Sequence, residues 1–457
     1  MTATPVNERQ RQAIDHPCDR PLKVAAGPGT GKTHLLAERY LRLLTREGLQ
    51  PREILAITFT NRAAAEMRER VVRYGRESGA VPRALDLVDG WIGTFHGICL
   101  RLVQEQPLAA GLHTSIATLD EMEKRRLRAA LRQRLLDGDL CMPQAAEASG
   151  SRRLGRGDRR ERSPSAHSAG SQSWGEASAS ERSPSPHCAL RALLQPGQVC
   201  PGWSSGEAAC SGGERRLSGP DWHPDETLLL DLVADEFWRG VWATVDRLQD
   251  LLVTPEEFGS GALARAAQRR DELHARLAGA IAPGERDRAT QDLADYAALP
   301  GLARVVEVLY HAYLEELRRR GALDFPGQIM AAYRLLAENP DVQARYRAQF
   351  RHILVDEVQD TSGAQMKVVA ALAAPGLCNV TVIGDQKQSI YGWRGARPEN
   401  LAQIQPVGLG GAEIGLQANY RSYQEILDVA RHALMPLVAA GRVRQDELDL
   451  VAHNGAA

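Results

Sequence analysis

The sequence of 457 residues is poor in aromatic side chains, nearly neutral in net charge, and free of long apolar segments. Aromatic residues account for 5% of the chain, and the formal net charge is -1. Bulk charge therefore gives no sign of a nucleic-acid partner, and any such contact would have to come from local basic or stacking groups. Without an apolar run of about 20 residues or a signal-peptide pattern, we expect a soluble cytoplasmic protein with no membrane partner.

Cysteine is also scarce and scattered. The seven cysteines include no C-x-x-C pair, and those between residues 141 and 210 are spaced at intervals that fit no metal-ligand pattern. An odd count and wide spacing argue against a disulfide framework and against a zinc site. We therefore expect neither.

Residues 1 to about 110 alternate between patterns typical of strands and of helices. Leu22–Ala25 is a short apolar stretch that ends in a glycine-rich turn, and apolar residues at helical spacing follow from Thr33. Ile54–Phe59 predicts a second strand, and Ala63–Arg70 predicts a second helix. This alternation is typical of a parallel sheet with crossover helices, so the sequence predicts an α/β fold.

Residues 142–225 differ in composition from the rest of the chain. Ser, Gly, Arg and Pro dominate, no apolar period survives, and the string ERSPS occurs at 161–165 and again at 181–185. Such a composition cannot bury a core. We predict a flexible, disordered insert that the fold can lose, because closing a longer loop costs little extra entropy; a folded accessory module is the alternative.

Helical patterns lie on both sides of this insert. Leu127, Leu131 and Leu135 recur every four residues within 115–140, and helical periodicity resumes over about 226–345. Apolar strands return after residue 350, in the segments HILVDE and VTVIGD. A helical insertion is therefore predicted to interrupt the α/β domain.

The strongest local signal is a glycine-rich loop between a predicted strand and a predicted helix. It is formed by Ala26, Gly27, Pro28, Gly29, Thr30, Gly31, Lys32 and Thr33. Glycines let backbone N–H groups turn inward around phosphate oxygens, and the start of a helix adds favourable partial positive charge. Lys32 can reach the β- and γ-phosphates of a nucleotide, and the Thr33 hydroxyl can bind Mg²⁺. The sequence thus predicts a P-loop that binds ATP.

A P-loop needs acidic partners for magnesium and water, and the segment after the strand HILV supplies them. Asp356 can hold Mg²⁺, and Glu357 can orient and deprotonate the attacking water. An isolated Asp-Glu pair is usually a solvated turn. Behind a buried strand and downstream of a P-loop, it predicts a catalytic site.

Together with these two sites, six further segments resemble the motifs of the superfamily 1 helicases of the UvrD, Rep and PcrA group, in the same order. They are the Q motif (Asn7–Ala13), motif Ia (Thr58–Met67), motif Ib (Gly93–His96), a segment before motif II (Leu323–Phe325), motif III (Gly384–Ala396) and motif IV (Asn419–Ser422). The resemblance covers about 1–140 and 300–435. It implies a RecA-like lobe that hydrolyses ATP with Mg²⁺ and moves 3′ to 5′ on single-stranded DNA.

The resemblance also implies roles for individual residues at the nucleotide. Gln10 would read the adenine edge, and Tyr420 and Arg39 would sandwich the base by stacking. Gln388 would sense the γ-phosphate and couple its loss to the DNA track. Arg421 would stabilise charge on the transferring phosphoryl group, as an arginine finger does.

On the DNA side, the resemblance implies contacts that are independent of base sequence. Stacking aromatics and polar groups are expected at Phe59, Thr60, Asn61, Phe95, His96, Tyr391, Trp393 and Arg394. Bases stack on aromatic rings at roughly 1–3 kcal/mol each, whatever the base. The expected partners are single-stranded DNA and junctions between single- and double-stranded DNA.

These features predict a division of the chain. The expected parts are a RecA-like lobe at 1–112, a helical subdomain at 113–345 that contains the insert, the rest of that lobe at 346–412, and the start of a second lobe at 413–457. Few residues follow Ser422, so the later motifs V and VI of the family are absent from this sequence. Because ATP lies between two lobes in this family, we expect the chain alone to bind ATP weakly and to show little DNA-stimulated hydrolysis.

Several alternatives remain open at this point. Lys387 stands where UvrD and Rep usually have an acidic residue, which is more like the RecB/AddA branch of helicase–nuclease subunits. The chain could also be an ATP- and DNA-binding module without motor activity, or the product of a broken reading frame. A repair or replication pathway is expected for the helicase, and the sequence does not name one.

Overall fold

The computed structural model describes residues 6–77, 89–140, 235–279, 283–297, 299–441 and 448–453. The chain divides into two compact units. We call them the sheet unit (Met1–Leu127, Val245–Thr254 and Tyr313–Ala457) and the helical unit (Arg128–Thr244 and Pro255–Ala312). The disordered insert predicted at 142–225 lies outside the described residues. Among the described residues, no helix is long and apolar enough to cross a membrane.

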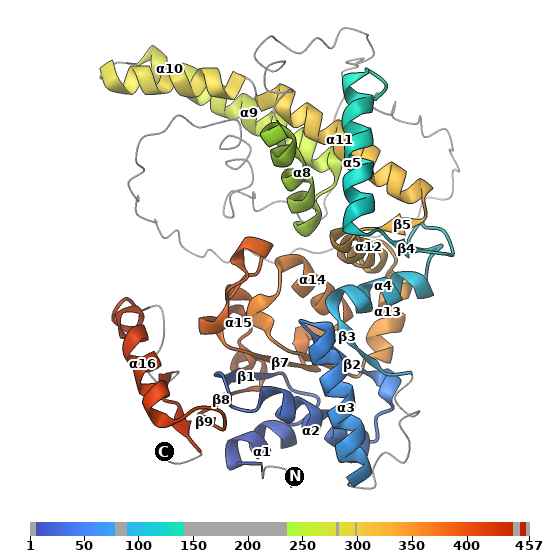
Figure 1. Cartoon of the computed structure of the whole chain (residues 1–457), viewed down its shortest axis with the longest axis vertical. Helices are drawn as coiled ribbons and strands as arrows, with labels where there is room; N and C mark the ends of the chain where they lie inside the picture. The colour runs from blue at the N-terminus through green and yellow to red at the C-terminus, as the bar shows by residue number, and fades with distance from the viewer. Residues whose placement is uncertain are drawn as a thin grey trace, which may run out of the picture. The chain divides into compact units, whose positions relative to one another are not determined.

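A six-stranded sheet forms the centre of the sheet unit, and every strand pair in it is parallel (Figure 1). In spatial order the strands are β3 (Trp91–Thr94), β2 (Ile54–Thr58), β6 (His352–Val355), β7 (Val380–Gly384), β1 (Leu22–Ala26) and β8 (Ala412–Leu416). The predicted α/β fold with a parallel sheet is confirmed. Because all strands run the same way, the segments that follow β1, β6 and β7 meet at one edge of the sheet.

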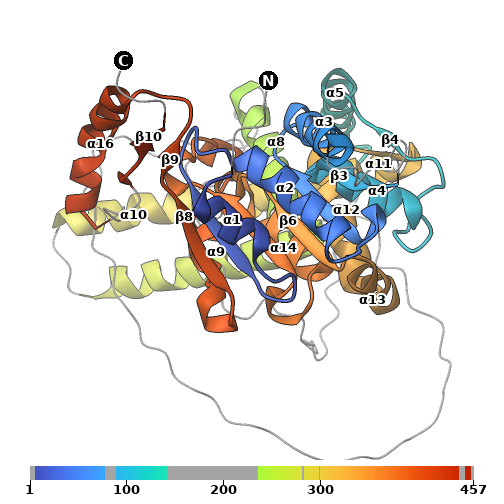
Figure 2. The same ribbon diagram turned by 90° about the horizontal axis from the view of Figure 1, so that it is seen from below.

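Helices cover both faces of this sheet. On one face, apolar residues of α1 (Glu8–Asp15), α2 (Lys32–Thr45) and α3 (Asn61–Glu77) form a core cluster with alternate strand residues; α1 and α2 lie side by side in Figure 2. The other face is covered by α4 (Phe95–Glu105), α12 (Phe325–Glu338), α13 (Pro340–Gln349), α14 (Gly363–Leu372) and α15 (Glu399–Gln403). Such burial of both faces explains why the strands read as near-continuous apolar runs.

Smaller elements complete the sheet unit. The remaining strands form two parallel pairs, β4 (Ala117–Thr118) with β5 (Ala322–Leu323), and β9 (Ala418–Asn419) with β10 (Val451–Ala452). Short 3₁₀ turns follow the strands at η3 (Val358–Asp360), η5 (Gln386–Gln388) and η6 (Gly392–Arg394), and α16 (Gln424–Ala439) follows β9.

The helical unit contains α9 (Pro255–Ala278), α10 (Pro283–Ala297) and parts of α5 (Glu121–Leu136), α8 (Asp235–Asp250) and α11 (Leu299–Arg319). Within it, Arg132 lies over the ring of Trp238 and Arg128 over the ring of Trp242, at 5.0 Å in each case. These contacts hold α5 against α8 through cation–π attraction. They account for two of the basic residues interleaved with leucines in α5, Arg128 and Arg132.

The units do not follow the boundaries predicted from the sequence. Helices α12 and α13, which the sequence-based division places in the helical subdomain, belong to the sheet unit. Their apolar residues Leu335, Leu336 and Tyr346 are buried in the core cluster on the sheet. Strand β8 also joins the first sheet, although its residues fall almost wholly in the predicted second lobe. Helical periodicity shows that a helix has a buried face, but not which neighbour covers it.

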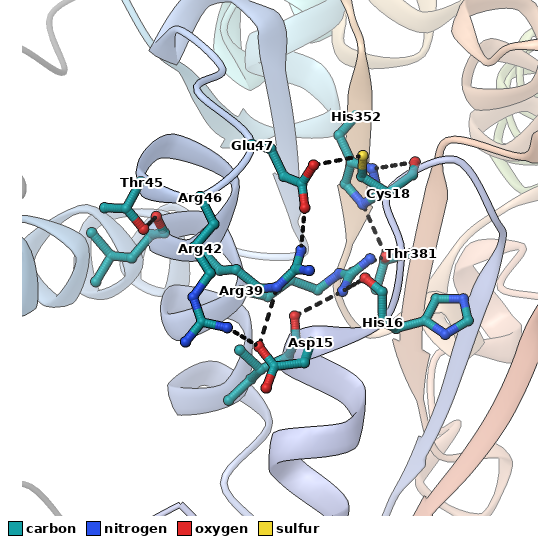
Figure 3. A network of polar contacts seen from close by, with 12 residues as sticks. Asp15, His16, Cys18, Arg39, Arg42, Thr45, Arg46, Glu47, His352 and Thr381 are labelled. Carbon is teal, nitrogen blue, oxygen red and sulfur yellow. Dashed lines mark hydrogen bonds and ion pairs between the residues drawn. The ribbon is translucent and has the colours of Figure 1, made fainter.

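A buried polar network joins α1 and α2 to two central strands (Figure 3). Arg39 of α2 is fully buried, and its Nε donates to Thr381 Oγ1 at 3.0 Å. Its Nη1 donates to three backbone carbonyls at the end of α1, those of Ala13, Ile14 and His16. Arg39 therefore fixes the P-loop helix to the segment before β1 and to β7.

His352 of β6 extends the same network. Its Nδ1 lies 3.2 Å from the carbonyl oxygen of Cys18, which can only accept, so Nδ1 carries the proton. Its Nε2 lies 3.0 Å from Thr381 Oγ1, which already accepts from Arg39 and so donates to the ring. This pattern requires a neutral imidazole. Burial, reinforced by the charge of Arg39, lowers the pKa of His352 well below its ordinary value.

The free energy of unfolding is expected to fall as the pH drops below about 6.5, with a slope of up to about 1.4 kcal/mol per pH unit from His352 alone. The folded state holds His352 neutral, whereas the unfolded chain binds a proton there below about pH 6.5, so acid favours unfolding. Urea denaturation between pH 5 and pH 8 measures this slope. His352→Gln should reduce it, whereas replacing the exposed His432 with glutamine should not; equal slopes in both variants would contradict the assignment.

Candidate nucleotide and DNA site

The predicted P-loop connects β1 to α2 at the carboxyl edge of the sheet. Ala26 ends β1, and α2 begins at Lys32 with Gly31 as its N-cap. Gly29 has φ +71°, and a Cβ there would lie 2.7 Å from Cβ of Arg421, so neither its backbone nor its surroundings admit a side chain. The loop is closed internally by Thr30, whose hydroxyl donates to the carbonyl of Gly27 at 2.8 Å.

The acidic segment after β6 faces this loop. Lys32 Nζ lies 2.8 Å from Glu357 Oε2, with 11% and 30% of the two side chains exposed. Glu357 is one of the few non-glycine residues with a positive φ, at 49°. Strained backbone of this kind costs about 1–3 kcal/mol and often occurs at functional sites. Here it accompanies a carboxylate that meets the P-loop lysine.

The electrostatics of this acidic segment favour a cation. Burial raises the pKa of Asp356, the charge of Glu357 raises it further, and Lys32 opposes both. Burial likewise raises the pKa of Asp360 to about 6, with Glu357 adding to the effect. Carboxylates whose charged forms are disfavoured by burial and by each other are stabilised by a nearby divalent ion.

The residues present therefore fit Mg²⁺ and a nucleotide triphosphate. Asp356 is 4% exposed, and the hydrogen bond it accepts in the structure comes from the backbone N–H of Glu357 at 3.0 Å. Thr33 lies half-buried on the first turn of α2, where the helix N-terminus attracts phosphate. Hard oxygen ligands of this kind suit Mg²⁺, which usually keeps several waters and shares phosphate oxygens.

The Q motif and motif IV meet at the P-loop. Gln10 is 2% exposed; its Nε2 donates to the carbonyl of Thr30 at 3.0 Å and its Oε1 accepts from the N–H of Asn7. The hydroxyl of Tyr420 accepts from Nδ2 of Asn7 at 2.8 Å, and its backbone N–H donates to the carbonyl of Gly29 at 2.8 Å. The structure thus brings Gln10 and Tyr420 to the loop from opposite ends of the described chain.

Asn419 anchors motif IV, although its place in the sequence did not mark it as a site residue. It is fully buried, donates to the carbonyl of Pro28 at 2.6 Å, and accepts from the backbone N–H groups of Arg421 and Ser422. These bonds hold Arg421, the candidate arginine finger, with its Cβ close to Gly29. The ring of His453 packs beside Tyr420 with centroids 4.6 Å apart, and it too was not predicted.

The prediction that Arg39 stacks on the adenine opposite Tyr420 is wrong. Arg39 is fully buried, and its guanidinium is bonded to Thr381 and to backbone carbonyls of α1 (Figure 3). At about 100° and 1.5 Å per residue, it lies roughly 9 Å farther along the helix than Thr33 and on a different face. Its role in this structure is to connect elements of the core.

An aromatic strip lies on segments that follow β2 and β7. The rings of Phe59 and Tyr391 are 4.9 Å apart, and those of Tyr391 and Trp393 are 6.4 Å apart. Trp393 is 75% exposed, and the guanidinium of Arg394 lies 4.6 Å from its ring centroid. Adjacent rings, one exposed and two partly buried, with a guanidinium beside them are suited to stacking bases next to a phosphate backbone.

Two polar residues predicted to contact DNA lie at the start of α3. Thr60 is exposed, and its hydroxyl accepts from the N–H of Ala63 at 3.1 Å. Asn61 is the first residue of the helix and is also exposed. The start of a helix attracts phosphate, so their placement suits a contact to the DNA backbone.

The prediction of a DNA contact by Phe95 is wrong. Phe95 is 3% exposed and belongs to the core cluster beneath the sheet. His96 is partly buried, and burial lowers its pKa. Its ring meets the ring of Phe325 edge to face at 5.4 Å, and Phe325 is 54% exposed. Phe325 therefore offers the exposed aromatic surface that was expected of Phe95.

Motif III begins at the end of β7 with a buried aspartate. Asp385 is 3% exposed, and its carboxylate accepts from Gln388 Nε2 at 2.9 Å and from Lys387 Nζ at 2.8 Å. Gln388, the predicted γ-phosphate sensor, is therefore held by Asp385 in this structure. Lys387, the departure noted in the sequence, neutralises the buried carboxylate.

Comparison with known proteins identifies the chain's relatives. The family model described as the UvrD/REP helicase N-terminal domain matches residues 6–407. The ATP-dependent DNA helicase PcrA of Leuconostoc citreum is 27% identical over 425 residues, which are 93% of this chain and 38% of that protein. The ATP-dependent DNA helicase UvrD1 of Mycobacterium tuberculosis is 28% identical over 94% of this chain and 39% of its own length. DNA helicase II of Escherichia coli is 25% identical over 93% and 39%. The chain thus spans about two fifths of the length of these curated relatives.

Proposed function

The chain belongs to the UvrD/REP helicase family, and from that premise we propose that it binds and hydrolyses ATP and moves 3′ to 5′ along single-stranded DNA. The proposal extends to unwinding of duplex DNA at junctions, in repair or replication. The relatives named as ATP-dependent DNA helicases support it. The described site supports it through chemistry that is independent of those names.

In this proposal the nucleotide lies along the P-loop. The backbone from Gly27 to Gly31 and the side chain of Lys32 bind the phosphates, and Tyr420 stacks on the adenine. Gln10 reads the adenine edge, which its position beside Thr30 supports. Binding of the phosphates takes Lys32 away from Glu357, because phosphate oxygens and the carboxylate compete for the same ammonium group.

Hydrolysis follows from the groups around the γ-phosphate. Mg²⁺, held through Asp356 and Thr33, would neutralise charge on the phosphate oxygens. Glu357, freed from Lys32, orients a water molecule and accepts its proton. Arg421, whose Cβ the anchored Asn419 turn holds close to Gly29, offsets negative charge in the transition state. Gln388, which belongs to motif III, responds to the presence of the γ-phosphate.

The position of motif III is the observation that carries the proposal. Strand β7 lies between β1 and β6, so it ends beside the Lys32–Glu357 pair. A few residues later the same segment presents Tyr391 and the exposed Trp393. One short segment thus spans from the phosphate-binding edge to a surface suited to stacking bases.

Phosphate release by the purified chain, measured with and without an oligothymidylate, tests the proposed activity. Stimulation by the oligonucleotide supports it, and strand displacement on duplexes with a 3′ or a 5′ tail tests the direction. A chain that binds neither a fluorescent ATP analogue nor single-stranded DNA would contradict the proposal.

Replacing Trp393 with alanine is expected to weaken the binding of oligothymidylate by about 5- to 150-fold, since stacking of one base contributes roughly 1–3 kcal/mol. Fluorescence anisotropy of a labelled oligonucleotide measures the dissociation constant. Tyr423→Ala serves as the control, because Tyr423 is also an exposed aromatic, at 49%, but lies outside the aromatic strip. Equal losses in the two variants would show that the aromatic strip is not the DNA site.

A further inference from the structure

Gln359 lies in the turn after the catalytic acidic segment, and the proposed chemistry does not use it. It is 1% exposed, the second residue of η3, and part of neither the P-loop nor motif III. A buried amide must satisfy its hydrogen-bonding groups within the protein. The partners of Gln359 therefore indicate what its side chain does.

The side-chain amide of Gln359 connects two functional segments. Its Nε2 donates to Glu357 Oε2 at 2.7 Å, the same oxygen that meets Lys32. Its Oε1 accepts from the backbone N–H of Asp385 at 3.0 Å. One planar amide thus lies between the candidate catalytic base and the first residue after β7.

Two further features tighten this connection. The backbone carbonyl of Gln359 accepts from the hydroxyl of Ser389 at 3.1 Å, so both the side chain and the main chain hold motif III. A Cβ at Gly384 would lie 2.5 Å from Gln359 Oε1, so only glycine at the end of β7 lets the amide approach. The close approach is therefore built into the sequence of β7.

Motif III carries the connection onward to the surface. Asp385 holds Gln388 through its carboxylate at 2.9 Å, and Ser389 is two residues before Tyr391. Tyr391 contacts Phe59 and lies beside Trp393. A continuous series of contacts therefore runs from Lys32 through Glu357 and Gln359 to the aromatic strip.

We propose that Gln359 is a positioning residue that couples occupation of the phosphate site to the affinity of the aromatic strip for single-stranded DNA. Phosphate draws Lys32 from Glu357, the carboxylate changes its partners, and the amide of Gln359 transmits that change to the backbone of Asp385. The inference rests on the proposed function. It adds a residue of the acidic segment after β6 through which the two sites affect each other.

The test is a thermodynamic cycle on the full 457-residue chain. The dissociation constant of a labelled oligothymidylate is measured with and without a saturating, non-hydrolysable ATP analogue and Mg²⁺. By linkage, the ratio of the two constants equals the factor by which DNA changes the affinity for the nucleotide. For the parent chain we expect a ratio of about 5-fold or more, within the usual range for coupled sites.

Two substitutions separate coupling from support of the fold. Gln359→Met keeps approximate volume and removes the hydrogen bonds of the amide to Glu357, Asp360 and Asp385. Gln359→Glu keeps an oxygen for the N–H of Asp385, but places a carboxylate against Glu357 and Asp360 and so breaks the links to the acidic segment alone. Gln328→Met is the matched control, because Gln328 is 2% exposed and its amide donates to Thr118, away from both sites.

We expect both Gln359 variants to reduce the ratio to within twofold of 1, whereas each affinity measured alone stays within about threefold of the parent. The control should keep the parent ratio. A parent-like ratio in Gln359→Glu would overturn the inference, as would a parent chain that binds both ligands with a ratio of 1. Failure of the parent chain to bind either ligand would instead contradict the proposed function.

Discussion

Replacing Lys32 with alanine is expected to lower the affinity of the chain for Mg-ATP by about 100-fold or more while the fold persists. A hydrogen bond to a charged partner contributes roughly 1.5–3 kcal/mol, and about 1.4 kcal/mol is a tenfold change in affinity. Lys32 is placed to meet two phosphates, which explains the size of the effect. Isothermal titration calorimetry with the non-hydrolysable analogue measures it.

The matched control for this variant is Lys23→Ala. Lys23 of β1 forms an ion pair with Glu413 at 3.4 Å, and 12% of its side chain is exposed, close to the 11% of Lys32. Both substitutions remove a partly buried lysine from a glutamate, so their effects on the thermal midpoint should be similar. Only the Lys32 variant should lose affinity for the nucleotide. An unchanged affinity for Mg-ATP in Lys32→Ala would falsify the assignment of the P-loop.

The loss of Lys32 should also change the response of the site to pH. Lys32 is the group that opposes the raised pKa values of Asp356 and Asp360. Without it, no positive charge from Lys32 offsets burial and the charge of Glu357, and both pKa values rise further. The charged carboxylates that Mg²⁺ needs then form only at higher pH, and this further lowers the affinity for Mg-ATP.

Local chemistry made much of the nucleotide site predictable. The P-loop pattern requires backbone freedom at Gly29 and Gly31, and both have positive φ in the structure. The strand predicted at Leu22–Ala25 agrees with β1, and the one at Ile54–Phe59 agrees with β2, to within one residue at their ends. Because these strands are buried on both faces, their sequences are continuous apolar runs, which can be recognised without a structure.

Residues whose role depends on which way the side chain points were harder to predict. Arg39 follows the P-loop closely in sequence, but helical geometry turns it into the core, where Thr381 accepts from its Nε and main-chain carbonyls accept from its Nη1. Phe95 and His96 are adjacent, and nothing in the sequence showed that the first faces inward. The exposed ring of Phe325 comes from a segment more than 200 residues away, and only the fold brings it to His96.

Gln359 and Asn419 illustrate a second limit. Each is a buried amide that binds one main-chain group of another motif, the N–H of Asp385 for Gln359 and the carbonyl of Pro28 for Asn419. Main-chain partners leave no mark in a sequence, because any residue supplies an N–H or a carbonyl. The available signal was their position inside recognised motifs, beside Glu357 and Tyr420, and that position did not specify what they bind.

Replacing Glu357 with glutamine is expected to lower the rate of ATP hydrolysis by about 10²- to 10⁴-fold, the usual contribution of a general base. Glutamine preserves the shape of the side chain and the strained backbone at this position, but it cannot take the proton of the attacking water. Affinity for Mg-ATP should stay the same or rise, because the substitution removes a negative charge beside the phosphates and releases Lys32 from its ion pair.

Single-turnover hydrolysis with the chain in excess over labelled ATP measures this rate and detects slow turnover by the parent chain. Glu413→Gln is the control, because Glu413 is also a lysine-paired glutamate with 30% of its side chain exposed, the same fraction as Glu357. It should hydrolyse ATP at the parent rate. A Glu357→Gln rate within threefold of the parent would show that another group accepts the proton; a candidate would then be Asp360, whose pKa of about 6 lets it act as a base near neutral pH.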